Sequence, residues 1–274
     1  MSNLPPSGEI PRGAIRFNTD SNKPELWDGS QWAEFQLSTP NLGTSDDRQP
    51  GARGIFIGGE TPTKKADIDI INFASAQNSV DFGDLNTTGS APATLASSTR
   101  AIAAGGETPS VVNTIEFITI ASTGSATDFG GILTDARRRL QNQGGGNQTR
   151  GMICGGYDGS NNTAAAETWN GTNWTSVNSM NTARRELAGA GSVNTAAIAF
   201  GGKEPAGTAK TELYNGTNWT EKNDLGTSRS SLGGSGTSTA ALAFGGMVPP
   251  GATATGKTET WNGTNWTETG DLNT

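Results

Sequence analysis

The side chains in this sequence that could do chemistry are carboxylates and arginines that recur at equivalent places along the chain. The carboxylates lie on short segments typical of strands, and each arginine lies three residues before a leucine. Paired carboxylates are the groups with which most glycosidases cleave a sugar linkage, and arginines bind anions. The recurring groups are Asp67, Asp69, Glu116, Glu167, Glu212 and Glu259 among the acids, and Arg137, Arg184 and Arg229 among the bases.

The repetition itself argues against an active site made of these groups, because an active site needs different groups from different parts of a fold. Residues of one kind at equivalent places are typical of solvated strand faces, and we predict such faces for the carboxylates. For the arginines we predict hydrogen bonds to backbone carbonyls or to a carboxylate that tie one unit to the next. The alternative is an anion-binding ring around a channel. We therefore expect no catalytic residue, no metal, no cofactor and a protein that is not an enzyme.

Two further features of the composition narrow the chemistry. The chain has no histidine, which excludes catalysis by Ser-His-Asp or Cys-His arrangements and removes the commonest ligand of zinc and copper. Its one cysteine, Cys154, lies in the apolar run "RGMICGG", where a small buried side chain is expected rather than a redox group.

The bulk composition indicates an all-β protein. Among 274 residues, 39 are Gly and only 16% are charged, which is typical of short strands joined by many turns. The net charge of -7 and the lack of a long basic run argue against nucleic acid as a partner. No stretch approaches the ~20 apolar residues of a membrane span, and the N-terminus lacks the apolar region of a signal peptide. We expect no membrane insertion and a chain made and assembled in a cytoplasm.

A short apolar run that ends in Gly-Gly occurs five times in the sequence. The runs are "GIFIGG", "AIAAGG", "GMICGG", "AIAFGG" and "ALAFGG", and by subtraction their Gly pairs lie 44 to 50 residues apart. Such a period is typical of β-propeller blades. Within the fourth unit, "ARRELAGAGS", "AAIAFGG", "KTELYNG" and "NWTEKNDL" are predicted as four successive strands.

These units resemble the kelch repeat, in which Gly-Gly closes the second strand, an aromatic residue ends the third, a Trp opens the fourth and an Arg begins the next unit. The resemblance covers about residues 45–274 and implies a β-propeller, with five blades favoured. The residues that carry its structural repeat are Gly58, Gly59, Gly105, Gly106, Gly155, Gly156, Gly201, Gly202, Gly245, Gly246, Trp169, Trp174, Trp219, Trp261 and Trp266.

The stretch "WNGTNW" at 169–174 predicts a hairpin between the third and fourth strands. A two-residue turn at Asn170-Gly171 would pair Trp169 with Thr172, whereas a four-residue loop would set Trp169 opposite Trp174. Both registers leave the two Trp on one face. We predict that they pack against the neighbouring blade; the alternative is stacking on a ligand. Because the chain is expected to fold in a cytoplasm, the Asn-x-Thr triplets here are turns rather than glycan sites.

Residues 1–38 form the first predicted domain, and 39–274 the second. The stretch "GAIRFNTDSNKPELWDGSQWAEF" resembles the small β module of tail-fibre and other virion proteins of tailed bacteriophages. That resemblance implies a docking or trimerisation module, with Ile15, Phe17, Trp27 and Trp32 as candidate virion-docking residues. In the alternative, residues 12–38 form a three-stranded sixth blade of the propeller.

The loops between second and third strands vary most from unit to unit, and variable loops on a rigid scaffold are the usual place for recognition. We expect a structural and host-attachment protein of a tailed-phage virion, with other virion proteins, copies of itself and a host glycan or receptor as partners. A carbohydrate-binding propeller is the alternative, and a glycosidase the next. The candidate ligand or receptor residues are Tyr157, Asp158, Lys203, Glu204, Pro249 and Pro250.

Overall fold

The computed structural model of the chain describes residues 14–18, 23–27, 29–34, 53–60, 62–72, 78–97, 99–120, 122, 124–142, 149–250 and 253–273. Every regular element among these residues is a β-strand, as the composition predicts. The chain divides into two compact units, Met1–Pro40 and Asn41–Thr274.

The N-terminal unit contains one antiparallel sheet in the order β1-β2-β3. Trp27 lies opposite Trp32 across the β2-β3 hairpin, and their ring centroids are 5.5 Å apart. The indole of Trp27 is buried, and the Arg16 guanidinium lies 4.2 Å from the Trp32 ring centroid. The strands are β1 (Ile15–Asn18), β2 (Lys23–Trp27) and β3 (Trp32–Glu34).

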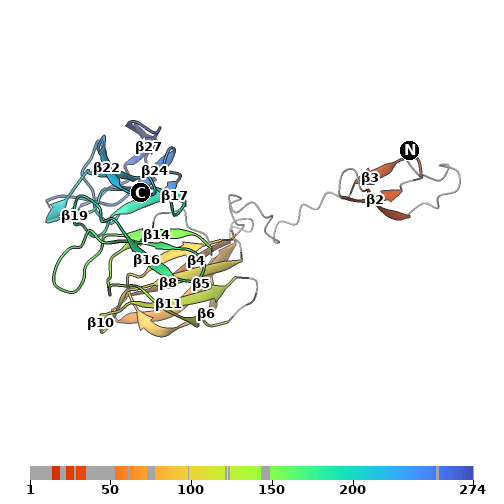
Figure 1. The fold of residues 1–274 in the computed structure, drawn as a ribbon, viewed down its shortest axis with the longest axis horizontal. Helices are drawn as coiled ribbons and strands as arrows, with labels where there is room; N and C mark the ends of the chain where they lie inside the picture. The colour runs from red at the N-terminus through yellow and green to blue at the C-terminus, as the bar shows by residue number, and fades with distance from the viewer. Residues whose placement is uncertain are drawn as a thin grey trace. The chain divides into compact units, whose positions relative to one another are not determined.

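The second unit is a five-bladed β-propeller (Figure 1). The alternative of a sixth blade built from residues 12–38 is wrong, because β1 to β3 form a sheet within the separate N-terminal unit. Blade 1, as far as the described residues go, contains β4 (Arg53–Glu60), β5 (Lys64–Asn72) and β6 (Val80–Gly89). Blade 2 contains β7 (Ala93–Ala96), β8 (Arg100–Ala104), β11 (Thr114–Thr119) and β12 (Thr127–Ile132).

The last three blades have the same four-stranded build. Blade 3 contains β13 (Gln141–Asn142), β14 (Gly151–Cys154), β15 (Ala166–Trp169) and β16 (Trp174–Val177). Blade 4 contains β17 (Ala188–Val193), β18 (Ala196–Phe200), β21 (Thr211–Tyr214) and β22 (Trp219–Lys222). Blade 5 contains β23 (Gly233–Gly236), β24 (Ala241–Phe244), β27 (Thr258–Trp261) and β28 (Trp266–Thr269).

Each four-stranded blade is an antiparallel meander, because strands that follow one another in the blade are also hydrogen-bonded neighbours. First strands of successive blades contact one another: β7 contacts β13, β13 contacts β17, and β17 contacts β23. Among the described residues, three blades also carry a two-stranded hairpin between their second and third strands. These hairpins are β9 (Glu107–Thr108) with β10 (Ser110–Val111), β19 (Lys203–Glu204) with β20 (Ala206–Gly207), and β25 (Met247–Val248) with β26 (Thr253–Ala254).

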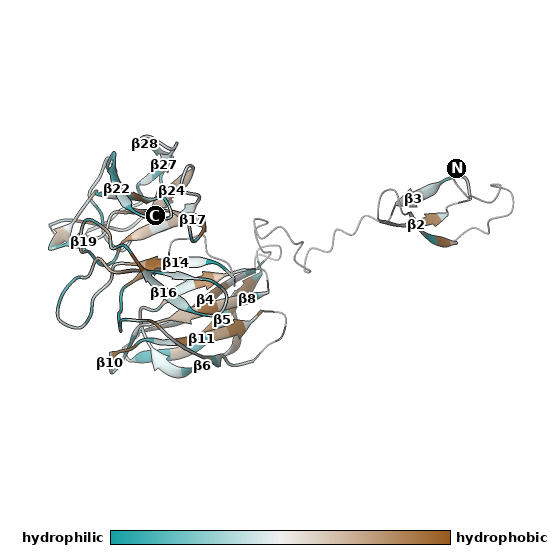
Figure 2. Ribbon diagram, in the orientation of Figure 1, coloured by the Kyte–Doolittle hydropathy of each residue, from teal (hydrophilic) through white to brown (hydrophobic). Residues whose placement is uncertain are grey.

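The hydrophobic core is divided into clusters that lie between neighbouring blades. On β14, Met152 and Cys154 belong to the cluster shared with blade 4, whereas Ile153 belongs to the cluster shared with blade 2. Because side chains alternate along a strand, the second strands bury both faces and are therefore apolar throughout. Figure 2 shows this apolar character on β14, the second strand of blade 3. Cys154 is a small buried residue, as predicted.

The Gly pairs have a steric reason. Gly105 has φ +69, and a Cβ at this position would lie 2.6 Å from the backbone oxygen of Arg137. At Gly155, φ is +65 and the corresponding distance to the Arg184 oxygen is 2.5 Å. A side chain at either place would have both an unfavourable backbone conformation and a clash with the connection to the next blade.

The "WNGTNW" hairpin closes through a four-residue loop, since Trp169 lies opposite Trp174. Asn170 Oδ1 accepts hydrogen bonds from the backbone N–H groups of Thr172 and Asn173, both at 2.9 Å. These side-chain hydrogen bonds stabilise the four-residue loop. The two-residue alternative is wrong. Both Trp are buried in the cluster shared with blade 2, which confirms packing against the neighbouring blade.

Candidate functional site

The most regular polar feature of the propeller is a buried arginine at the start of blades 3, 4 and 5. We call each arginine with its carboxylate an arginine clamp; the clamps are Arg137 with Glu167, Arg184 with Glu212, and Arg229 with Glu259. In blade 5, Nη1 of Arg229 donates to the carbonyls of Gly245 at 2.9 Å and Lys257 at 2.6 Å. Its Nη2 donates to Glu259 Oε1 at 2.8 Å. The planar guanidinium thus ties the second strand of its own blade to the third.

The same residues also join successive blades. The backbone N–H of Gly202 in blade 4 donates to the Arg229 carbonyl at 2.8 Å. The second carboxylate oxygen of Glu259 accepts the backbone N–H of Gly226 at 2.6 Å, and Gly226 lies in the connection that leaves blade 4. Equivalent bonds link blade 3 to blade 4 through Arg184 and Glu212. Each arginine clamp is therefore a joint between two blades.

This arrangement decides between the predictions for the arginines and corrects the one for the carboxylates. The three arginines are 0% exposed, so a solvent-facing anion ring is wrong. Each guanidinium donates to backbone carbonyls and to a carboxylate, as predicted, but these bonds lie within its own blade. The tie to the preceding blade runs through the arginine's carbonyl and through the glutamate. Glu116, Glu167, Glu212 and Glu259 are buried rather than solvated, because the strand register turns each of them toward the neighbouring blade. Burial lowers the pKa of the Arg184 guanidinium from its ordinary value, and the Glu212 carboxylate opposes that shift. On blade 1, Asp67 is exposed and Asp69 is half-buried.

Blade 2 has the acceptors of an arginine clamp without the arginine. In blades 3, 4 and 5 the arginine lies two residues before a non-glycine residue with positive φ, and in blade 2 the residue at that place is Gly89. The positive-φ residues are Ala91, Arg139, Glu186 and Ser231, with φ values of 57, 53, 56 and 53. The local sequences agree, since "LNTTG" at 85–89 aligns with "LTDAR", "MNTAR" and "LGTSR".

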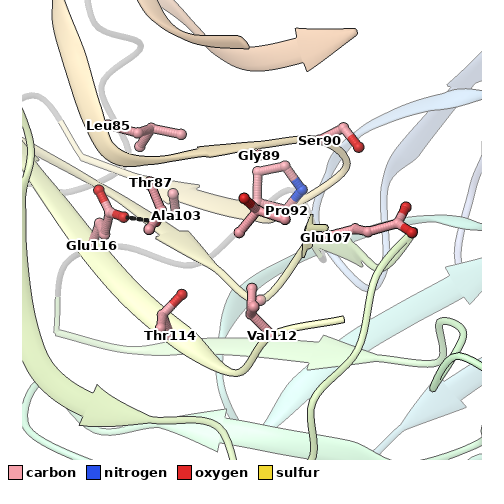
Figure 3. A pocket seen from close by; sticks show the side chains of 12 residues that line it. Leu85, Thr87, Gly89, Ser90, Pro92, Ala103, Glu107, Val112, Thr114 and Glu116 are labelled. Atoms are coloured by element: carbon pink, nitrogen blue, oxygen red, sulfur yellow. Dashed lines mark hydrogen bonds between the residues drawn. The ribbon is translucent and has the colours of Figure 1, made fainter. Parts of the chain in front are cut away.

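The vacated space in blade 2 is a pocket, which we call the vacant niche. Its lining includes Gly89, Gly105, Thr114 and Glu116, with Leu85 and Val112 as apolar walls. Figure 3 shows Glu116 with its hydrogen bond to Thr87 at one side of the pocket and Glu107 at the other. About 320 Å³ is free of protein atoms when the open mouth is counted.

The predicted recognition loops lie on the hairpins and turns between second and third strands. Lys203 and Glu204 form β19, whereas Pro249 and Pro250 lie between β25 and β26. Backbone bridges join these segments to the connections between blades, as for Arg185 with Lys203. The hairpins and the connections between blades therefore lie on one face of the propeller, which we call the loop face.

Blade 3 has a bridged turn at this place, with Tyr157 bridged to Asn162. Arg138 and Arg185 lie 5.1 Å and 5.2 Å from the Tyr157 ring centroid, within range of cation-π attraction. Asp158 Oδ1 accepts the N–H groups of Ser160 and Asn161, both at 2.7 Å. These two bonds hold the pKa of the Asp158 carboxyl below its ordinary value, and the bond from Asn161 has the larger effect.

Glu107 is the charged group that joins this face to the vacant niche. Its carboxylate forms an ion pair with Arg138, which lies in the connection to blade 3. It also pairs with Lys64 of blade 1, whose Nζ lies 3.5 Å from Glu107 Oε2. Burial raises the pKa of the Glu107 carboxyl, but the two cations outweigh burial, so that this pKa lies below its ordinary value. Glu107 is thereby fixed as an anion in the pocket wall.

The candidate docking residues of the N-terminal unit differ in accessibility. Ile15 is 67% exposed and Trp32 is half-buried beside Trp27. Phe17 lies on β1, and its side chain is outside the described residues. Trp27 is 5% exposed, so it supports the sheet, and Ile15 is the most exposed of the three candidates whose side chains are described.

The fold and these sites together define the class of the protein: a five-bladed β-propeller whose blades 2 to 5 are joined in series by buried polar contacts. Neither the models of known protein families nor the curated proteins include a match to this chain. Across the described parts of the chain, no three His, Cys, Asp or Glu side chains form a group that could hold a metal ion. In those same parts, no helix is long and apolar enough to cross a membrane.

Proposed function

We propose that the chain is a non-enzymatic structural and host-attachment protein of a tailed-phage virion. In this proposal the N-terminal unit docks to other virion proteins, and the propeller is displayed outward as a binding head of kelch type. Copies of the chain assemble with one another, and the loop face carrying Tyr157 and Lys203 meets a host glycan or receptor.

The observation that carries this proposal is the pairing of two units of different build. The first is a small sheet with an exposed apolar side chain, Ile15, on the sequence that resembles virion modules. The second is a propeller in which Glu167, Glu212 and Glu259 are each occupied by an arginine. Because these carboxylates are paired and buried, they are poorly placed to attack a sugar, and binding is the better-supported role.

Carbohydrate binding through the tryptophans has less support. Trp174 and Trp219 are 8% and 6% exposed, and each packs in a core cluster between blades. A sugar that stacks on either indole would first have to separate two blades. A lectin site on this chain would therefore use the loop face instead.

The test compares two exposed apolar residues of similar accessibility, one in each unit. Ile15 is 67% exposed and Val80, on β6 of the propeller, is 62% exposed. The full chain carrying Ile15→Asp or Val80→Asp is expressed during growth of the tailed phage that encodes it, and its copy number in purified particles is measured by mass spectrometry. We expect Ile15→Asp to lower incorporation at least about tenfold and Val80→Asp to leave it unchanged. Particles that lack the unaltered protein contradict the proposal.

A further inference from the structure

We propose that the vacant niche of blade 2 binds a guanidinium group supplied from outside the chain. The inference does not rest on the virion proposal, since it follows from a comparison among the blades of one molecule. In three blades, an arginine of the chain itself fills the equivalent space.

The backbone around the niche has the same form as in the filled blades. Gly89 occupies the place of the arginine, because Ala91, two residues later, has φ 57. A Cβ added to Gly58 of the preceding blade would lie 2.8 Å from the carbonyl oxygen of Gly89. In the same way, a Cβ added to Gly105 would lie 2.6 Å from the carbonyl oxygen of Arg137. The loss therefore concerns one side chain and not the surrounding fold.

The hydrogen-bond acceptors of the niche are also those of an arginine clamp. The N–H of Gly105 donates to the Thr114 carbonyl at 2.9 Å, as Gly155 donates to Ala165 in blade 3. In blade 3 the carbonyls of Gly155 and Ala165 both accept from Arg137. By this equivalence, the Gly105 and Thr114 carbonyls are where a guanidinium would donate.

The third acceptor is the carboxylate of Glu116, which is 6% exposed. Its Oε2 accepts the backbone N–H of Asn86 at 2.8 Å, as the glutamates of the other blades accept from the preceding connection. Its Oε1, which would face the arginine, accepts the hydroxyl of Thr87 at 2.6 Å instead. Within the described residues, no cationic side chain takes the arginine's place. A guanidinium would compensate this buried charge.

The vacant niche is more exposed to solvent than the equivalent places in the other blades. Gly105 is half-buried and Thr114 is exposed, whereas Gly155 and Gly201 are buried beneath their arginines. The space free of protein atoms, about 320 Å³ with the open mouth counted, leaves room for a guanidinium group. Two carbonyls and a carboxylate match the fork of donors of a guanidinium better than the point charge of an ammonium.

Two sources could supply the group: an arginine side chain of a partner polypeptide, or a small free guanidino compound. We test them by NMR titration of the full chain with Nα-acetylarginine methylamide and with methylguanidine, while Nα-acetylcitrulline methylamide serves as the uncharged control. We expect saturable shifts of the Gly105, Thr114 and Glu116 amides in the millimolar range with both cations. Citrulline should bind at least about tenfold more weakly.

The source follows from the ratio of the two dissociation constants. An arginine derivative that binds at least about fivefold more tightly than methylguanidine indicates a polypeptide ligand, whereas equal binding indicates recognition of the guanidinium alone. Either result supports the niche as a guanidinium site. Equal binding of the citrulline control, or no shift at these amides with either cation, overturns the proposal.

Two substitutions at one position provide a matched pair. A Cβ at Gly89 would meet no atom closer than 3.7 Å, so Gly89→Ala and Gly89→Arg both fit the backbone. We expect Gly89→Arg to fill the niche from within and to weaken binding of the arginine derivative at least about tenfold. Gly89→Ala should change it less than about threefold. Unchanged binding in folded Gly89→Arg protein places the ligand elsewhere and refutes the assignment.

Discussion

Blades 3, 4 and 5 each contain a buried arginine paired with a glutamate. Blade 2 has the equivalent hydrogen-bond acceptors, but Gly89 stands where the other blades have the arginine. In the filled blades one oxygen of the glutamate receives the guanidinium and the other a backbone N–H. In blade 2 the hydroxyl of Thr87 stands in for the guanidinium at Glu116. The difference teaches that the glutamate and the arginine are separable: the carboxylate joins two blades even where no cation accompanies it.

Breaking a filled arginine clamp gives the largest effect that this comparison predicts. Arg184→Met keeps an extended side chain but leaves Glu212 buried without its cation, and we expect a loss of about 3–5 kcal/mol in the free energy of unfolding. Urea unfolding measures it. The double variant Arg184→Met with Glu212→Leu should recover most of the loss, because no buried charge remains. A single-variant loss below about 1 kcal/mol would mean that the joint carries little stability.

The next effect concerns two glycines, Gly155 beside a filled arginine clamp and Gly89 at the vacant niche. In Gly155→Ala the backbone keeps φ +65 at this residue, and the new Cβ lies 2.5 Å from the Arg184 carbonyl oxygen. We expect a loss of about 2–3 kcal/mol from strain and displacement of the connection. Gly89→Ala is the control, since its Cβ meets nothing within 3.7 Å. It should be neutral or stabilising by about 0.4–1 kcal/mol through the unfolded state. Equal losses in the two variants contradict the steric account.

The smallest effect is at the loop face, outside the joints. Because the folded pKa of Asp158 is lowered by backbone hydrogen bonds, its contribution to stability is present above the ordinary carboxyl pKa. That contribution is lost as pH falls through the lowered value. The difference in free energy of unfolding between the wild type and Asp158→Asn should therefore shrink as pH falls from the ordinary carboxyl pKa to the lowered one. We expect a few tenths of a kcal/mol, since solvent screens this exposed group. A difference that does not change with pH would show that the carboxylate is not held by these bonds.

Much of the fold could be predicted from the sequence, because its signals are local. The five Gly pairs indicate five repeated units, and the alignment of Arg184 with Arg229 indicates a tie between units. The turn at Asn170 could not be decided, because Asn and Gly suit both loop lengths. Its side-chain hydrogen bonds settle the length in the structure.

The sites proved harder to predict than the fold. Repetition at Glu212 and its equivalents suggested solvated faces, yet repetition also arises when one buried contact recurs in every blade. Burial of a charge depends on a partner that is distant in sequence, here 28 residues away for Arg184. The vacant niche was missed because its signal is an absence: the Gly of "LNTTG" is noticed only against the Arg of "LTDAR". Glu107 gives no sequence signal, since its partners come from two other blades.

The most direct test of the account is the coupling between positions 89 and 116 in a double-mutant cycle. Gly89→Ala and Gly89→Arg are each combined with Glu116 or Glu116→Gln, and the four free energies of unfolding are measured in urea. Coupling is the suitable quantity, because desolvation of the added guanidinium offsets its net gain. We predict that arginine is favoured over alanine by at least about 1 kcal/mol more with Glu116 than with Glu116→Gln. Zero coupling in folded variants would contradict the claim that blade 2 is an arginine clamp without its arginine.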